Sequence, residues 1–225
     1  MLTMSFPAWF RFFTPHKTIP KTPWTAEHQW QISPLRIFML VLGLALFGIG
    51  DALVISSDIG NAPWSVLAQG LSLRFDVSIG LATVFVGAAV LLLWIPLKRR
   101  VGLGTIVNIF VISAFIDLGL MIFPQAENQI FGVGYVLGGT LLVGLGSALY
   151  LTCGLGAGPR DGLMTGLHEK TGVRVGRVRL TLEVLVLISG ALLGGTWGLG
   201  TALFAIAIGQ SVAIWLGVVA RTTAR

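Results

Sequence analysis

Long apolar runs without a single charged residue alternate with short polar segments along this chain. The charge-free runs cover 37–50, 79–97, 101–116, 131–158, 184–209 and 211–220. A helix needs about 20 mostly apolar residues to cross the hydrocarbon core of a membrane. The runs show no strand-like alternation of apolar and polar positions. The pattern therefore predicts six membrane-spanning helices, at about 36–57, 79–97, 102–123, 132–153, 177–195 and 198–220.

The composition is also typical of an integral membrane protein. Hydrophobic residues make up 55% of it and charged residues only 11%, whereas soluble domains carry about 25% charged residues. Backbone polar groups in lipid must be satisfied within their own segment, which favours helices. We therefore expect an all-α membrane protein.

Glycines recur along the chain at a fixed offset of 96 residues. Gly60 and Gly156 are one pair of residues separated by this offset, and Pro63 and Pro159 are another. Of the nine glycines between positions 43 and 104, eight meet another glycine at this offset, where chance would give about one. The chain is therefore predicted to contain a duplicated unit.

The positions of the basic residues predict how the two copies are oriented. With six spans and a cytoplasmic N-terminus, 14 of the 15 Lys and Arg residues fall on the cytoplasmic side, and only Arg74 falls outside. This is the asymmetry that the positive-inside rule describes. Because each copy has three spans, an odd number, the second copy is inverted. We expect an interfacial basic and aromatic tail at 1–35, repeats at 36–123 and 132–220, an external linker at 124–131 and a cytoplasmic tail at 221–225.

Each repeat also contains a segment too short to cross the membrane, between its first and second spans. Both segments pass from a glycine to a proline, and proline suits the first turn of a helix. We expect one additional short broken or re-entrant helix in each repeat. Unpaired N–H groups at such helix starts can hold anions. The candidate substrate-binding residues are Gly60, Asn61, Pro63, Gly156, Gly158, Pro159, Arg160 and Asp161. The alternative is a packed turn and an interfacial helix that close the bundle.

Ionisable residues inside the spans form a second group of candidates, since a charge at the centre of a span costs about 2.5–3.5 kcal/mol. Asp51 has no basic residue within a helical turn, so it is a candidate for carrying a proton. Glu183 is either a second coupling carboxylate or the partner of Arg179 in a structural ion pair. Asp117 is a third coupling candidate. Asn108 and Gln210 are candidates for lining a polar path.

Several motifs resemble those of the YczE/YitT-like bacterial membrane proteins. They are Gly60-Asn61-Ala62-Pro63-Trp64-Ser65-Val66-Leu67, Pro159-Arg160-Asp161-Gly162-Leu163-Met164, Gly102-Leu103-Gly104-Thr105 with Asn108, and Gly198-Leu199-Gly200-Thr201. The resemblance covers about 36–220 and implies an integral protein of the bacterial inner membrane, for which transport or export is an expected role. Ser65 stands where an acidic residue is common in the first motif, so the resemblance assigns no carboxylate there.

These observations favour a secondary transporter or exporter of a small molecule, working by alternating access. A partner-binding regulator or assembly factor and a passive channel-like facilitator are the alternatives. We expect no enzyme, cofactor or metal site, because nucleotide-binding and zinc-protease motifs are missing and the three histidines do not cluster. The expected partners are membrane lipid and an unidentified small molecule, not nucleic acid. The sequence leaves open whether the chain forms a homo-oligomer. Cys153, the single cysteine, is interpreted as a packing residue.

Overall fold

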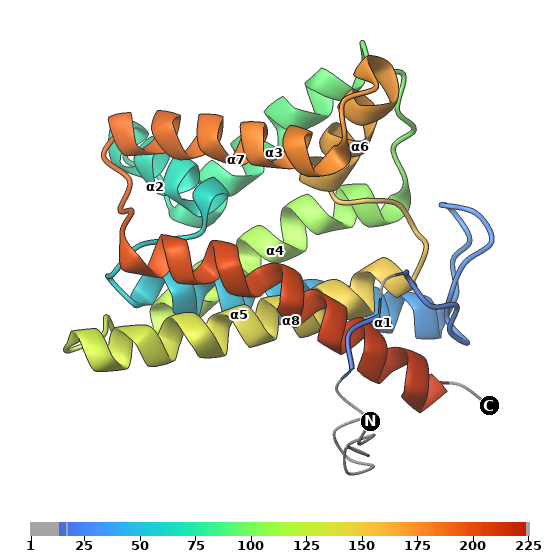
Figure 1. Ribbon diagram of the computed structural model, residues 1–225, viewed down its shortest axis with the longest axis horizontal. Coiled ribbons are helices and arrows are strands. Elements are labelled where there is room, and N and C mark those ends of the chain that lie inside the picture. Colours follow the sequence, from blue (N-terminus) through green and yellow to red (C-terminus); the bar gives the residue numbers. More distant parts are fainter. Residues whose placement is uncertain (1–13, 17, 224–225) are drawn as a thin grey trace, which may run out of the picture.

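A computed structural model of the chain describes residues 14–16 and 18–223 and builds them as eight α-helices without a strand (Figure 1). The helices are α1 (Pro34–Ser56), α2 (Pro63–Phe75), α3 (Ile79–Trp94), α4 (Leu103–Ile122), α5 (Gln129–Thr152), α6 (Pro159–Thr171), α7 (Val175–Leu192) and α8 (Leu199–Thr223). The all-helical fold is thus confirmed. Both short segments that follow a glycine and a proline are helices of 13 residues.

Within the described residues, four helices are long and apolar enough to cross a membrane, namely α1, α4, α5 and α8. The number rises to five if α2 and α3, which meet at a 113° bend, form one broken span. The other two helices in the predicted span positions depart from a simple span. Helix α3 has 16 residues, which corresponds to about 24 Å of helix and less than the roughly 30 Å of a hydrocarbon core. Helix α7 carries Arg177, Arg179 and Glu183.

The 96-residue offset of the sequence reappears in the helix boundaries. In the first half of the chain three helices begin at Pro63, Ile79 and Leu103, and in the second half their counterparts begin at Pro159, Val175 and Leu199. Prolines at the first helical position account for the shared starts of α2 and α6, because proline has no N–H to leave unpaired there. The same glycine and proline placement, repeated 96 residues later, therefore accompanies the same helix boundaries twice.

The helices lie in two layers with α4 between them (Figure 1). Helices α1, α5 and α8 form one layer, and the shorter α2, α3, α6 and α7 form the other. Helix α1 packs along α5 through glycines: a Cβ added to Gly43 would lie 2.8 Å from the Gly146 oxygen, and one added to Gly50 would lie 2.7 Å from the Gly139 oxygen. Small residues of this kind let membrane helices approach closely.

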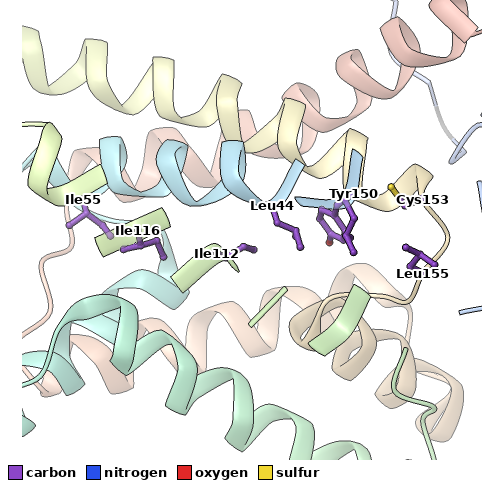
Figure 2. Close-up of a cluster of buried hydrophobic side chains, with 8 residues drawn as sticks. Leu44, Ile55, Ile112, Ile116, Tyr150, Cys153 and Leu155 are labelled. Atoms are coloured by element: carbon purple, nitrogen blue, oxygen red, sulfur yellow. The ribbon is translucent and has the colours of Figure 1, made fainter. Parts of the chain in front are cut away.

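Apolar side chains fill the space between α1, α4 and the end of α5. Figure 2 shows this cluster, which comprises Leu40, Leu44, Ile55, Ile112, Ile116, Tyr150, Cys153 and Leu155. Cys153 is fully buried in it, which agrees with its interpretation as a packing residue. The cluster holds α5 firmly on α1, and so it fixes the positions of Asp51 and Tyr150 described below.

The chain reverses before each short helix at a glycine that rests on the opposite half of the chain. Gly60 has φ +121° and Gly156 has φ +120°, a backbone region that favours glycine. Beside Gly60, the Ile59 oxygen accepts a 2.8 Å hydrogen bond from the Gly200 nitrogen. Beside Gly156, the Leu155 oxygen accepts a 2.8 Å bond from the Gly104 nitrogen. Each turn is therefore anchored on the start of the last helix of the other half.

The segment before α1 packs against the end of α5. Trp24 donates from Nε1 to Thr152 Oγ1 over 3.0 Å, and the Ala26 nitrogen donates to the Cys153 oxygen over 2.9 Å. Arg36 donates from Nε to the Trp24 oxygen over 3.2 Å. This part of the predicted interfacial tail is thus attached to the helical core, whereas residues 1–13, 17 and 224–225 lie outside the described part of the chain.

Candidate functional site

The first turns of α2 and α6 meet at a cavity of about 330 Å³ to which all eight helices contribute side chains. This volume lies at the lower end of the range for small-molecule sites. Pro63 and Trp64 line the cavity from α2, and Pro159, Arg160 and Asp161 line it from α6. The two helix starts that the sequence predicted as substrate-binding segments therefore face one space.

Most of the cavity wall is apolar. The apolar lining residues include Phe47, Val86, Val90, Ile109, Ile112, Val143, Leu182, Phe204, Ile208 and Val212. Five charged side chains interrupt this wall, namely Asp51, Arg160, Asp161, Arg179 and Glu183, together with the polar Asn108, Thr83 and Ser147. An apolar pocket with a few convergent polar groups is the usual form of a small-molecule site.

Asp51 lies on α1 and is 2% exposed. Ser65, in the first turn of α2, donates its hydroxyl toward both carboxylate oxygens, at 2.9 Å from Oδ1 and 2.8 Å from Oδ2. No basic group of the described residues comes within ion-pair distance of this carboxylate. Arg160 interacts with it electrostatically from beyond that distance. A buried carboxylate without a directly bonded cation is costly unless a proton or a ligand neutralises it.

Asp161 lies in the first turn of α6, and Tyr150 on α5 donates its hydroxyl to Asp161 Oδ2 over 2.6 Å. The two carboxylates thus have opposite arrangements. In the first half of the chain the long helix carries the acid, Asp51, and the short helix carries the hydroxyl, Ser65. In the second half the short helix carries the acid and the long helix carries the hydroxyl. Each carboxylate therefore has a hydroxyl donor from the neighbouring helix of its own half.

Arg160 lies over the ring of Trp64, with Cζ 5.1 Å from the ring centroid. These two residues occupy matching positions, 96 residues apart, immediately after the prolines of α2 and α6. The stacking is a cation–π interaction. It uses the face of the guanidinium and leaves its N–H groups free to donate hydrogen bonds. Among residues 14–16 and 18–223, no hydrogen bond or ion pair involves the Arg160 guanidinium.

Arg179 and Glu183 form an ion pair on α7, with Arg179 Nε 2.8 Å from Glu183 Oε1. Both residues line the cavity, and the Arg179 side chain is 46% exposed. The structural ion pair that the sequence left open for Glu183 is therefore present. Asn108 on α4 lies beside the start of α6, since its Nδ2 would be 3.2 Å from a Cβ added to Gly158.

Several sequence candidates lie away from the cavity lining. Asn61 is buried and donates from Nδ2 to Gln69 Oε1 over 2.8 Å. Asp117 accepts a 2.6 Å bond from the Ser78 hydroxyl and a 2.7 Å bond from the Gly80 nitrogen, so it holds the start of α3. Gln210 is exposed on α8. Gly60 and Gly156 form the turns beside the cavity and do not line it.

Sequence reasoning missed three side chains that determine the chemistry of the cavity, namely Ser65, Trp64 and Tyr150. The 96-residue offset matches Trp64 with Arg160 and Ser65 with Asp161, but it does not reveal the contacts that Trp64 and Ser65 make. Tyr150 carried no signal of its own, because its counterpart in the first half is Val54. No group of three side chains suited to a metal occurs in the described part of the chain.

Comparison with known proteins places the chain in a family. The family model described as "Family of unknown function (DUF6198)" matches residues 34–216. An uncharacterised protein of Haemophilus influenzae is 43% identical over 205 residues, which cover 91% of this chain and 94% of that protein. The uncharacterised membrane protein YczE of Bacillus subtilis is 32% identical over 200 residues, which cover 84% and 93%.

A third relative, the uncharacterised protein YyaS of Bacillus subtilis, is 26% identical over 190 residues, which cover 80% of this chain and 92% of that protein. No solved structure matches the chain. The similarity to YczE confirms the resemblance read from the glycine and proline motifs, and it agrees with an apolar helical membrane protein. The chain belongs to DUF6198, a family of unknown function.

Proposed function

We propose that this protein is a secondary transporter that moves a small molecule across the inner membrane by alternating access. The observation that carries the proposal is the meeting of two helix starts, one from each half of the chain, at a cavity that contains Asp51 and Arg160. Broken helices that present their starts to a central site are typical of transporters built from repeats. The charged groups in an otherwise apolar wall favour a cavity that binds a solute over a gap left by helix packing.

The proposal includes six spans arranged as two inverted repeats, with both termini in the cytoplasm. The equal spacing of the helix starts supports two structurally equivalent halves. The contacts of Gly60 with the start of α8, and of Gly156 with the start of α4, support a two-fold relation between them. The distribution of basic residues supports the inverted orientation. In this arrangement α3 and α7 are the second spans of their repeats.

The packing of the two halves differs in the way that alternating access requires. Helix α3 packs along α4, whereas the equivalent α7 has no comparable packing along α8. In the proposed cycle this packing is one of two states, open beside α7 and closed beside α3. In the other state the two halves exchange these packings, so that the cavity opens beside α3.

Thr83 on α3 and Arg179 on α7 occupy matching positions, and both line the cavity. Thr83 is 7% exposed, while the Arg179 side chain is 46% exposed. The test places a single cysteine at either site, as Thr83→Cys or Arg179→Cys, in a Cys153→Ser background. Membrane vesicles of both orientations are treated with a membrane-impermeant maleimide, and labelling rates are measured from each side.

Alternating access predicts that both cysteines react, and from opposite faces of the membrane. A Thr83→Cys variant that stays unreactive from both faces, while Arg179→Cys reacts, would contradict the proposal. A passive channel predicts that each cysteine reacts from both faces.

Asp51 is proposed to couple the exchange of states to a proton, because Ser65 is its hydrogen-bond partner and Arg160, the cation that interacts with it electrostatically, lies beyond ion-pair distance. The labelling rate of Thr83→Cys should then differ between acidic and alkaline pH after correction for the reactivity of a free thiol. The same comparison in a Thr83→Cys, Asp51→Asn protein should show no pH dependence. An unchanged pH response in that variant would remove Asp51 from the coupling role.

A further inference from the structure

Four of the five charged groups in the cavity already have a partner. Ser65 donates to Asp51, Tyr150 donates to Asp161, and Arg179 pairs with Glu183. Arg160 is the exception in the described part of the chain: its guanidinium stacks on Trp64 and makes no hydrogen bond there. A guanidinium carries five N–H donors arranged for the oxygens of a carboxylate or phosphate. Asp51 and Asp161 lie close enough to interact electrostatically with Arg160, but neither accepts a hydrogen bond from it in the described residues, so its N–H donors are available to an acid.

Asn108 lies beside the start of α6, near Asp161 and Tyr150, and lines the same cavity as Arg160. Its side chain has no hydrogen bond to the described residues, and it is not among their buried unsatisfied groups. The Asn108 amide is therefore available to donate a hydrogen bond to an acid bound in the cavity. The ligand also adds negative charge next to Asp51, which a proton on that carboxylate would offset.

The rest of the wall suits an apolar body. Phe204 and Ile208 on α8 and Leu182 on α7 line the cavity, and α7 and α8 do not pack along each other. Figure 1 shows the two helices in different layers. Gly209 lines the cavity there and is exposed, and a Cβ added to it would meet nothing within 4 Å. The proposed opening therefore lies between these two helices, on the side of the bundle that would face lipid in the six-span arrangement.

We propose that the cavity binds an amphipathic organic anion, with its acidic group on Arg160 and Asn108 and its apolar body in the opening between α7 and α8. This assignment rests on the proposed function, because it names the substrate class of the same cavity. The ligand enters sideways from the lipid, since a molecule with an apolar body concentrates there before it reaches the protein.

The test measures equilibrium binding by calorimetry to the full chain in lipid nanodiscs, with empty nanodiscs as the blank. The probes are decanoate, butyrate and the decyltrimethylammonium cation. We expect decanoate to bind, butyrate to bind much more weakly, and Arg160→Gln to weaken decanoate binding by about tenfold or more. Arg160→Lys should retain part of the affinity, and Arg74→Gln, an exposed arginine outside the cavity lining, should change nothing. Thermal unfolding checks that each variant is folded.

Two results would overturn the assignment. One is decanoate binding that is equal in Arg160→Gln and in the unchanged chain. The other is preferential binding of the decyltrimethylammonium cation that Asp51→Asn abolishes. Because binding is measured without transport, a protein that binds decanoate but fails the two-sided labelling test would refute the transporter and keep the ligand class.

A separate variant tests whether the ligand enters between α7 and α8. Gly209→Trp should slow decanoate association several-fold, since the indole occupies the opening. Gly138→Trp is the matched control, because a Cβ at Gly138 also meets nothing within 4 Å and Gly138 does not line the cavity. Equal association rates in the two tryptophan variants would exclude this entry route.

Discussion

Replacing Gly60 with alanine tests how the two halves of the chain hold each other. The residue has φ +121°, and an added Cβ would lie 2.5 Å from the Gly198 nitrogen and 2.8 Å from Thr201 Oγ1. A non-glycine residue in such a backbone region costs about 1–3 kcal/mol, and forced overpacking costs about 1–3 kcal/mol more. Gly60→Ala should therefore lower stability by about 2–6 kcal/mol. The nearest atom belongs to the backbone at the start of α8, so it cannot rotate away.

Gly156→Ala should be destabilising by less. Its φ is +120°, but the nearest atom to an added Cβ is a side-chain atom, Thr105 Oγ1, at 2.8 Å. The assay is thermal unfolding of the purified protein followed by tryptophan fluorescence. By the scale known for soluble domains, a loss of 2 kcal/mol lowers the midpoint by at least about 4 °C.

Gly134→Ala and Gly138→Ala are the controls, because a Cβ at either helical site meets nothing within 4 Å. Alanine is favoured over glycine in a helix by about 0.8–1 kcal/mol, so these variants should be unchanged or slightly more stable. The proposed contact between halves would be refuted if Gly60→Ala and Gly156→Ala unfolded at the same temperature as the controls.

Three further outcomes follow from individual contacts. Cys153 is fully buried, so the native protein should react with maleimide only after detergent unfolding, and rapid labelling of the folded protein would contradict its place in the core. Asp117→Ala should cost about 0.5–2 kcal/mol, measured by the same thermal assay, because it removes the group that holds the start of α3. Tyr150→Phe should weaken the protein by about 1.5–3 kcal/mol, since Asp161 loses a hydrogen bond to a charged group; a Phe variant as stable as the native chain would place that carboxylate in contact with water.

The fold was largely accessible from the sequence because duplication preserved the glycines and prolines that set helix boundaries. Pro63 and Pro159 were recognised as helix starts, and both begin helices. The site was only partly accessible. Arg160 and Asp51 were found because charges in apolar runs are conspicuous, but Tyr150 was not, because a tyrosine in an apolar run gives no indication of its hydrogen-bond partner. Asp117, like Asp51, is a carboxylate in an apolar run, and the sequence therefore suggests a coupling role for both. Only the contacts of Asp117 reveal that it holds a helix start.

The stacking of Arg160 on Trp64 limits which halves of the chain can combine. The two residues occupy equivalent positions in the two halves, 96 residues apart, and they stack on each other. A dimer of two first halves would set tryptophan against tryptophan and supply no guanidinium to the cavity. A dimer of two second halves would set arginine against arginine, where like charges repel at close range. Only one half of each kind therefore builds this contact, and a protein split within 124–131 should reassemble only from one copy of each half.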